Sequence, residues 1–93
     1  MSLVRAHFWV KGLVQGVGFR YFILRQAAAL QLNGWVRNRL NGIVEGVVEG
    51  PAERVKEFLD HCRRGPALAE VEEVRIHYEE PQGETTFRIR SSL

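Results

Sequence analysis

The stretch GLVQGVGFR, residues 12–20, places three glycines in seven positions and ends on an arginine. Before it, residues 4–11 alternate between apolar and mostly polar side chains, which is the period-two pattern of a half-buried strand. After it, apolar side chains recur at helical spacing from Phe19 to Leu30, and Gly34 after Asn33 is typical of a left-handed helix end. The glycine stretch is therefore predicted to connect a first strand to a first helix.

The middle of the chain predicts a β-hairpin. Residues 35–39 and 43–49 have the composition and patterning of strands. Between them stands Asn41-Gly42, a dipeptide that tight hairpin turns prefer. One face of the second strand consists of Val44, Gly46 and Val48. These two strands are therefore expected to be antiparallel neighbours.

A second helix and two further strands complete the pattern. Gly50-Pro51 opens the helix, with proline expected at its first position, and Gly65-Pro66 follows its end. The buried stripe of this helix is predicted to be Val55, Phe58, Leu59 and Cys62. Residues 71–78 predict a strand whose alternation slips at the start, as a β-bulge would cause. Residues 85–90 predict a short final strand with Phe87 and Ile89 inward.

The order of the elements is strand, helix, strand, strand, helix, strand, with a short C-terminal strand appended. This order predicts an α+β fold of the ferredoxin-like class, a split βαβ sandwich with two helices on one face of a mostly antiparallel sheet. A chain of 93 residues without a linker-like run is expected to form one domain over residues 1–93. Fold class alone does not define function, because this architecture carries RNA-binding, metal-binding and catalytic domains.

Composition and charge restrict the partners. Lysine and arginine number 13 against 11 for aspartate and glutamate, and the basic residues are spread along the chain rather than gathered in a stripe. This pattern favours a small anion over a nucleic acid. The single cysteine, Cys62, cannot form an internal disulfide, and the sequence has no signal peptide or long apolar run. We therefore expect a cytoplasmic protein with no membrane partner, and a monomer by default.

The glycine stretch also predicts an anion site. Backbone N–H groups of a glycine loop and of the first turn of a helix can converge on one point, and Arg20 adds a permanently charged planar fork suited to phosphate oxygens. The alternative is that Gly12, Gly16 and Gly18 only turn the chain and that Arg20 is solvated. Two better-known glycine motifs do not fit: the P-loop needs a following lysine, and the dinucleotide motif started at Gly16 would need glycine at Tyr21.

Two stretches carry a family resemblance. GLVQGVGFR, residues 12–20, closely resembles the first signature of the acylphosphatase family, and GWVRNRLNGIVEGVVEG, residues 34–50, resembles the second. The two motifs cover 26 residues in the order and at the separation expected for the family, since they are 9 and 17 residues long. One departure is the C-terminus, where many members end with an aromatic residue after the last arginine and this chain continues as Ser91, Ser92, Leu93.

The resemblance implies a hydrolase, an acylphosphatase, that cleaves the carboxyl–phosphate bond of small acyl phosphates into a carboxylate and inorganic phosphate without cofactor or metal. It implies that Arg20 and Asn38 are catalytic, Arg20 by binding the phosphate and Asn38 by positioning the attacking water. The phosphate-binding set that it implies, through main-chain amides, is Gln15, Gly16, Val17, Gly18, Phe19 and Arg20. Inorganic phosphate or sulfate is then expected to compete with the substrate.

The chemistry of such a substrate explains why so few residues could suffice. A carboxylate whose conjugate acid has a pKa of about 4 leaves without a proton donor, and a loose transition state needs only positioning and electrostatic stabilisation. Other phosphatase chemistries do not fit. The residue six positions after Cys62 is Leu68 rather than arginine, and Asp60 is the only aspartate. The histidines, His7, His61 and His77, lie on separate predicted elements without ligand spacing.

Two other functions stay open on this pattern. One is a non-catalytic module that binds phosphate or carbamoyl phosphate. The other is an RNA-binding ferredoxin-like domain, which is disfavoured because residues 43–49 offer no aromatic side chain for base stacking and place Glu45 and Glu49 outward.

Overall fold

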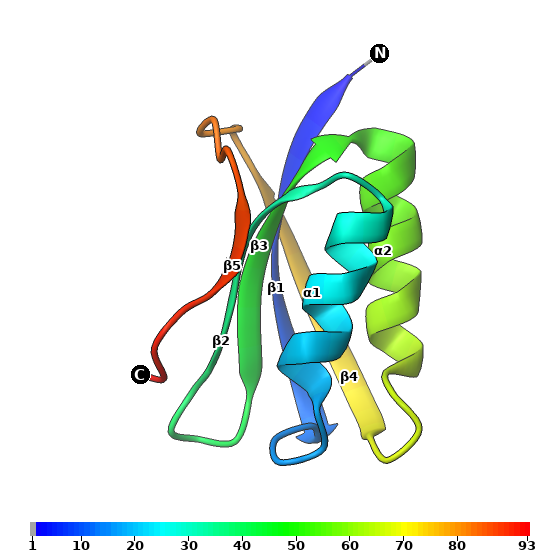
Figure 1. Ribbon diagram of the computed structural model, residues 1–93, viewed down its shortest axis with the longest axis vertical. Coiled ribbons are helices and arrows are strands. Elements are labelled where there is room, and N and C mark those ends of the chain that lie inside the picture. Colours follow the sequence, from blue (N-terminus) through cyan, green and yellow to red (C-terminus); the bar gives the residue numbers. More distant parts are fainter. Residues whose placement is uncertain (1) are drawn as a thin grey trace.

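The computed structural model describes residues 2–93, so Met1 lies outside the described part of the chain. The elements in chain order are β1 (Leu3–Leu13), α1 (Phe19–Ala29), β2 (Asn33–Asn38), β3 (Val44–Pro51), α2 (Ala52–Arg64), β4 (Glu70–Glu79) and β5 (Phe87–Ile89). The strands form one sheet in the order β4-β1-β3-β2-β5, and both helices cover the same face of it (Figure 1). Neighbouring strands are antiparallel except β2 and β5, which are parallel. The predicted ferredoxin-like fold with an appended C-terminal strand is confirmed.

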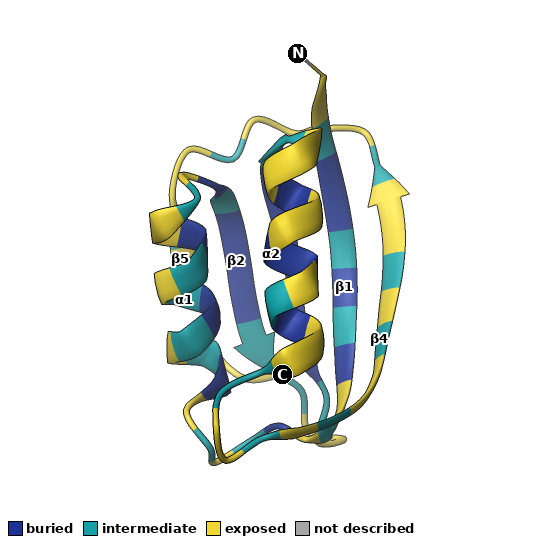
Figure 2. Cartoon of the chain, turned by 90° about the vertical axis from the view of Figure 1, so that its right-hand side faces the viewer, coloured by how far each residue is buried: buried dark blue, intermediate teal, exposed yellow. Residues whose placement is uncertain are grey.

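The hydrophobic core lies between the sheet and the two helices. Every second residue of β1 from Ala6 to Val10 is buried against the helices, and the predicted stripe of α2 is confirmed. Phe8 of β1 and Phe58 of α2 pack edge to face with ring centroids 5.6 Å apart. Figure 2 shows the buried side of both helices turned toward the sheet and β4 largely exposed at the sheet edge. β1 and β3 lie inside the sheet, so they hold in place the glycine loop that follows β1 and the hairpin turn that precedes β3.

The face of the sheet without helices carries buried charges. Arg5 is only 5% exposed and donates hydrogen bonds to Glu49 at 2.8 Å, to Glu79 at 2.8 Å and to Glu84 at 3.0 Å. Glu49 also accepts the backbone N–H groups of Gln82 and Glu84, which holds the connection between β4 and β5 against the sheet. Burial opposes the charge of Arg5, but the three carboxylates outweigh it and raise the guanidinium pKa above its ordinary value.

A second buried carboxylate, Glu45 of β3, lies on the same face. It accepts hydrogen bonds from His7 Nε2 at 2.7 Å, Arg37 Nε at 3.0 Å and Arg39 Nη1 at 3.1 Å. The sequence places Glu45 and Glu49 outward, and they do point away from the helices, but they are only 5% and 8% exposed. The part of this face around Arg5, Glu45 and Glu49 is therefore a layer of paired charges rather than an open polar surface.

The end of α1 differs from the sequence prediction. The helix ends at Ala29, and the left-handed residue that follows is Gln31, with φ 56°, rather than Gly34. Gly34 lies inside β2 with φ 149°, and a Cβ atom there would stand 2.0 Å from the backbone oxygen of Val47. Glycine is needed at this position because β2 and β3 approach each other closely, so the prediction of a helix stop at Gly34 is wrong.

The start of α2 differs slightly from the prediction, and the start of β4 agrees with it. Pro51 is the N-cap of α2, with φ −58° and ψ 137°, and not its first helical residue. The predicted irregularity at the start of β4 is confirmed, because Lys11 pairs with Glu73 whereas Gly12 pairs with Val71, so β4 has one more residue than β1 there. Neither helix of residues 2–93 is both long and apolar enough to cross a membrane.

Candidate active site

The glycine loop between β1 and α1 is open to solvent. Gly16 and Gly18 have left-handed φ angles of 75° and 78°, which residues other than glycine rarely adopt. A Cβ atom built on either residue would find no described atom within 4 Å. A ligand can therefore approach the main chain of this loop closely.

The first turn of α1 follows this loop directly and offers unsatisfied donors. Gly18 is the N-cap and provides no side-chain cap, and the first turn contains no acidic residue. The N–H of Phe22 donates to the carbonyl of Gly18 at 3.0 Å, so the three N–H groups before it lack a carbonyl acceptor within the helix. These donors and the positive end of the helix dipole favour an anion at this point.

Arg20 lies in the same first turn and is half-buried. Within residues 2–93 it makes no ion pair, whereas Arg37 and Arg39 are both bound to Glu45. Its positive charge is therefore uncompensated in the described part of the chain, at the helix end where the N–H donors are free. A guanidinium in this position can donate two parallel hydrogen bonds to one phosphate group.

Asn38 is the last residue of β2. Its neighbour Val36 belongs to the core and Arg37 lies on the helix-free face, so alternation turns the Asn38 side chain to the side of the helices. Its Oδ1 atom is buried and has no hydrogen-bond partner among residues 2–93. Such an unpaired buried acceptor costs roughly 1–3 kcal/mol and is rare in natural proteins, and a catalytic role is one explanation for it. The backbone carbonyl of Asn38 is held by the N–H of Leu93 at 3.0 Å.

The Gln15 side chain joins the glycine loop to the hairpin that carries Asn38. Its Nε2 donates to the carbonyl oxygens of Arg39, at 2.7 Å, and Ile43, at 3.0 Å. The loop after β1 and the turn between β2 and β3 lie at the same end of the sheet (Figure 1). The structure thus brings the predicted set, residues 15–20 and Asn38, to one end of the molecule. The side-chain contacts of Gln15 and the bond from Leu93 carry no sequence pattern that would have revealed them.

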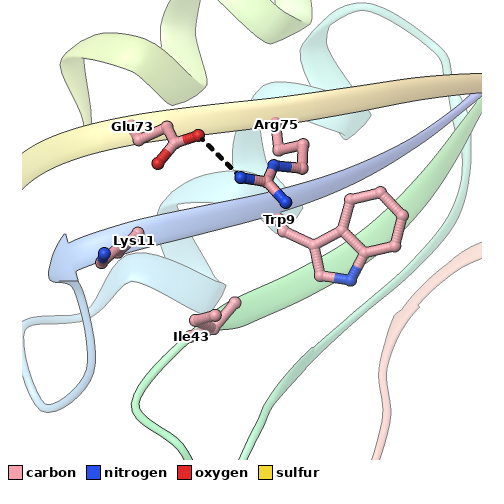
Figure 3. Close-up of a pocket in the computed structure, with 5 residues that line it drawn as sticks. All are labelled: Trp9, Lys11, Ile43, Glu73 and Arg75. Carbon is pink, nitrogen blue, oxygen red and sulfur yellow. Dashed lines mark hydrogen bonds and ion pairs between the residues drawn. The ribbon is translucent and has the colours of Figure 1, made fainter.

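A well-defined depression lies elsewhere on the protein. It has a volume of about 440 Å³ and is lined by Trp9, Lys11, Ile43, Glu73 and Arg75 (Figure 3). Arg75 is bound to Glu73 at 3.3 Å, and Trp9 stacks on His7, whose ring centroid is 4.1 Å away on the helix-free face. Neither Arg20 nor Asn38 lines this depression. A small anion bound by main-chain donors at a helix end needs no deep cavity, so we place the candidate site at the loop.

The other chemically reactive groups lie apart from this site. Cys62 is buried in the core, and burial raises the pKa of its thiol, which keeps it protonated and unreactive. Its predicted role as a core residue is confirmed. In the range 2–93 no three His, Cys, Asp or Glu side chains are grouped closely enough to hold a metal ion.

The chain is similar to known acylphosphatases in sequence and in fold. The family model described as acylphosphatase matches residues 6–89. A curated acylphosphatase of Moorella thermoacetica is 83% identical over 93 residues, which cover both chains completely. The crystal structure of acylphosphatase from Bacillus subtilis is 34% identical, with a TM-score of 0.91 over 94% of this chain and 98% of the other. Full-length HypF in its phosphate- and nucleotide-bound form is 28% identical, with a TM-score of 0.89, and the match spans 98% of this chain but only 12% of the HypF chain.

Proposed function

Since the chain belongs to the acylphosphatase family and is an acylphosphatase, we propose that its substrate phosphate binds to the amides of residues 15–20 and to Arg20, with Asn38 orienting the attacking water. The observation that carries this assignment is the uncompensated guanidinium of Arg20 beside the uncapped N-terminus of α1. An anion bound there would satisfy the free N–H donors and the positive charge together.

In the proposed reaction, a water oxygen attacks phosphorus and the bond from phosphorus to the acyl oxygen breaks. The bonding electrons leave with the carboxylate, which is a weak base and needs no proton donor. Amides and Arg20 stabilise charge on the equatorial phosphoryl oxygens of a loose transition state. The proton of the water passes to a phosphoryl oxygen of the substrate, because Asn38 is neutral and a poor base.

The buried Oδ1 of Asn38 supports its part in this scheme. An acceptor with no protein partner among the described residues is available to a hydrogen bond that forms only when the site is occupied. The side chain of Asn38 lies on the same side of the sheet as α1, whose first turn contains Arg20. A water held by Asn38 could therefore face a phosphorus atom held by the loop and Arg20.

The proposal includes the partners and setting expected from the sequence. The substrate is a small-molecule acyl phosphate, inorganic phosphate or sulfate competes for the same donors, and no nucleic acid takes part. Residues 1–93 act as a single domain and as a monomer in the cytoplasm. A purely phosphate-binding module is the second candidate, and its support is the likeness to one part of the much longer phosphate-bound HypF.

The test is hydrolysis of a simple aromatic acyl phosphate in EDTA, followed by absorbance. Wild type should hydrolyse it and leave an ordinary phosphate monoester intact. Arg20→Ala should lower kcat/KM by about 10³-fold or more, the range found for arginines that stabilise phosphoryl transfer. Arg25→Ala is the matched control, because Arg25 is exposed on the same helix and should leave the rate nearly unchanged.

Each other outcome contradicts a separate part of the proposal. A folded Arg20→Ala variant with full activity would remove Arg20 from the site. Loss of activity in EDTA, restored by a divalent ion, would contradict the metal-independent scheme. A folded wild type that binds phosphate but does not turn over any acyl phosphate would favour the binding module.

A further inference from the structure

The amide of Gln15 makes an unusual pair of contacts. Both hydrogens of its Nε2 are used, one toward the carbonyl of Arg39 at 2.7 Å and one toward that of Ile43 at 3.0 Å. These carbonyls belong to the two arms of the β2–β3 hairpin, and the N–H of Arg39 donates to the same Ile43 carbonyl at 2.8 Å. Figure 3 shows Ile43 where β3 begins, near the end of β1. Gln15 therefore closes the base of the hairpin from the side of the glycine loop.

This contact connects the two halves of the candidate site. Gln15 is the first residue of the proposed phosphate-binding set, and Arg39 follows Asn38 directly in the chain. Among residues 2–93, the Gln15 amide makes the side-chain hydrogen bonds that link the glycine loop to the hairpin. The side chain of Asn38 provides no such link, because its Oδ1 has no partner there. Pairing of both β1 and β2 with β3 sets the approximate separation of the loop and Asn38, and the Gln15 amide adds the side-chain link between them.

A role for the Gln15 side chain as a phosphate ligand does not fit these contacts. A phosphate needs donors, and both donor hydrogens of the amide are already bound to carbonyl oxygens. The remaining Oε1 atom is an acceptor and would repel an anion. Only the backbone of Gln15 is free to serve the phosphate.

We propose that Gln15 is a positioning residue, which fixes Asn38, and the water it orients, relative to the phosphate bound by the loop. This inference rests on the proposed function, because it needs the loop and Asn38 to act on one substrate. Its loss should leave phosphate binding nearly intact and slow the chemical step, since a misplacement of about 1 Å can cost about 100-fold in rate.

The experiment compares wild type with Gln15→Glu, which keeps the shape of the side chain and removes both N–H donors. We expect kcat for an aromatic acyl phosphate to fall between about 10- and 100-fold at pH 8. Because a carboxylate at residue 15 also repels phosphate, KM and inhibition by inorganic phosphate are compared in the neutral variant Gln15→Met, where they should change less than about threefold while kcat falls. Gln31→Glu is the matched control, because Gln31 is exposed after the far end of α1. It should behave like wild type.

Two further readouts separate positioning from a general structural role. Two facing carbonyl oxygens favour the neutral form of the introduced carboxyl, whose O–H can donate to one of them, so kcat relative to wild type should rise from pH 8 to pH 5. The charged groups next to the contact, Arg39 and Glu45, are bound to each other. Their titration affects the variant and the wild type alike, so it cancels in the ratio of the two kcat values. In an Asn38→Ala background, Gln15→Glu should slow turnover less than about threefold, because the two residues act as one unit.

Several results would overturn the proposal. These are an unchanged kcat in folded Gln15→Glu, a loss of phosphate inhibition in folded Gln15→Met, a ratio of kcat values that does not depend on pH, or effects that multiply with those of Asn38→Ala. Gln15→Met should lose kcat without recovery at low pH, and it carries the test alone if Gln15→Glu does not fold. A wild-type kcat in Asn38→Ala would instead remove Asn38 from the mechanism, a failure of the proposed function that the Asn38→Ala variant alone reveals.

Discussion

Replacement of Glu45 by glutamine should strongly destabilise the protein. Glu45 is 5% exposed and accepts hydrogen bonds from His7 at 2.7 Å, Arg37 at 3.0 Å and Arg39 at 3.1 Å. Glu45→Gln keeps the size of the side chain but removes its negative charge. One of its polar atoms becomes an NH₂ donor that faces the donors of its neighbours, so two arginines lose the carboxylate that holds them.

The size of the effect follows from the burial of the partners. Breaking a fully buried ion pair costs about 3–5 kcal/mol, because the remaining charge has no partner. The side chains of Arg37 and Arg39 are 17% and 37% exposed and can regain water, so we expect a smaller loss, about 2–3 kcal/mol. For a chain of this length that loss lowers Tm by roughly 10–20 °C.

The pH dependence of the loss identifies the carboxylate as its cause. Burial alone would raise the pKa of Glu45, but the hydrogen bonds from His7, Arg37 and Arg39 outweigh it, and the pKa lies below its ordinary value. A carboxyl with a lowered folded-state pKa contributes its full stability above the unfolded value, about 4.3, and loses it as pH falls through the folded value. The difference between wild type and Glu45→Gln should therefore be constant above about pH 5 and narrow below about pH 4.

Urea unfolding followed by tryptophan fluorescence at pH 7 and at steps from pH 5 to pH 3 measures this difference. Glu73→Gln is the control, because Glu73 is half exposed and its pair with Arg75 at 3.3 Å is open to water. It should change stability by no more than about 0.5 kcal/mol. If the two variants were equally mild, or if the Glu45→Gln difference stayed constant down to pH 3, the reasoning about the buried charge layer would be refuted.

Three other changes test the remaining parts of the structure. Gly34→Ala places a Cβ 2.0 Å from the Val47 backbone oxygen and should lower the free energy of unfolding by about 3 kcal/mol or more, measured by thermal unfolding. The control Gly83→Ala, with a φ of 79° and open space around it, should cost only about 1–2 kcal/mol. Equal losses would contradict the close approach of β2 and β3. Asn38→Ala should lower kcat more than it raises KM in steady-state kinetics, and the reverse pattern would make Asn38 a binding residue. Inorganic phosphate at about tens of millimolar should inhibit wild type competitively and inhibit Arg20→Ala much less, and a lack of competition in wild type would argue against the placement of the anion.

The sequence predicts the fold well where a pattern is local. Alternation in residues 4–11 sets the two faces of β1, and the helical stripe of α2 is correct in each of its residues. The end of α1 is mistaken because glycine after asparagine suits both a helix stop and a close approach of strands, and only the position of Val47 distinguishes them. Gln31 takes the left-handed angle without the glycine that such a position favours.

The candidate site is predictable through its motif and much less through physical reasoning alone. Glycines followed by Arg20 predict an anion-binding helix start, and the structure has an uncapped helix start after left-handed glycines at that place. Contacts between distant residues leave no local pattern. Hydrogen bonds join Gln15 to Arg39 and Ile43, and Arg5 to Glu49, across 24 to 44 residues of sequence. These contacts can therefore be recognised only in the folded structure.

The position of β1 within the sheet has a consequence for how the protein is made. β1 is synthesised before both of its partners, β3 and β4, so Arg5 can pair with Glu49 on one side and Glu79 on the other only after those later strands have been made. Pairing of strands so distant in sequence requires the closure of large loops, and the entropy of closure is lost before the strand contacts stabilise the chain. Folding is therefore slower than in proteins with mainly local contacts. The apolar residues of β1 therefore lack their strand partners until β3 has been synthesised, and the outer edge of β1 stays unpaired until β4 has followed.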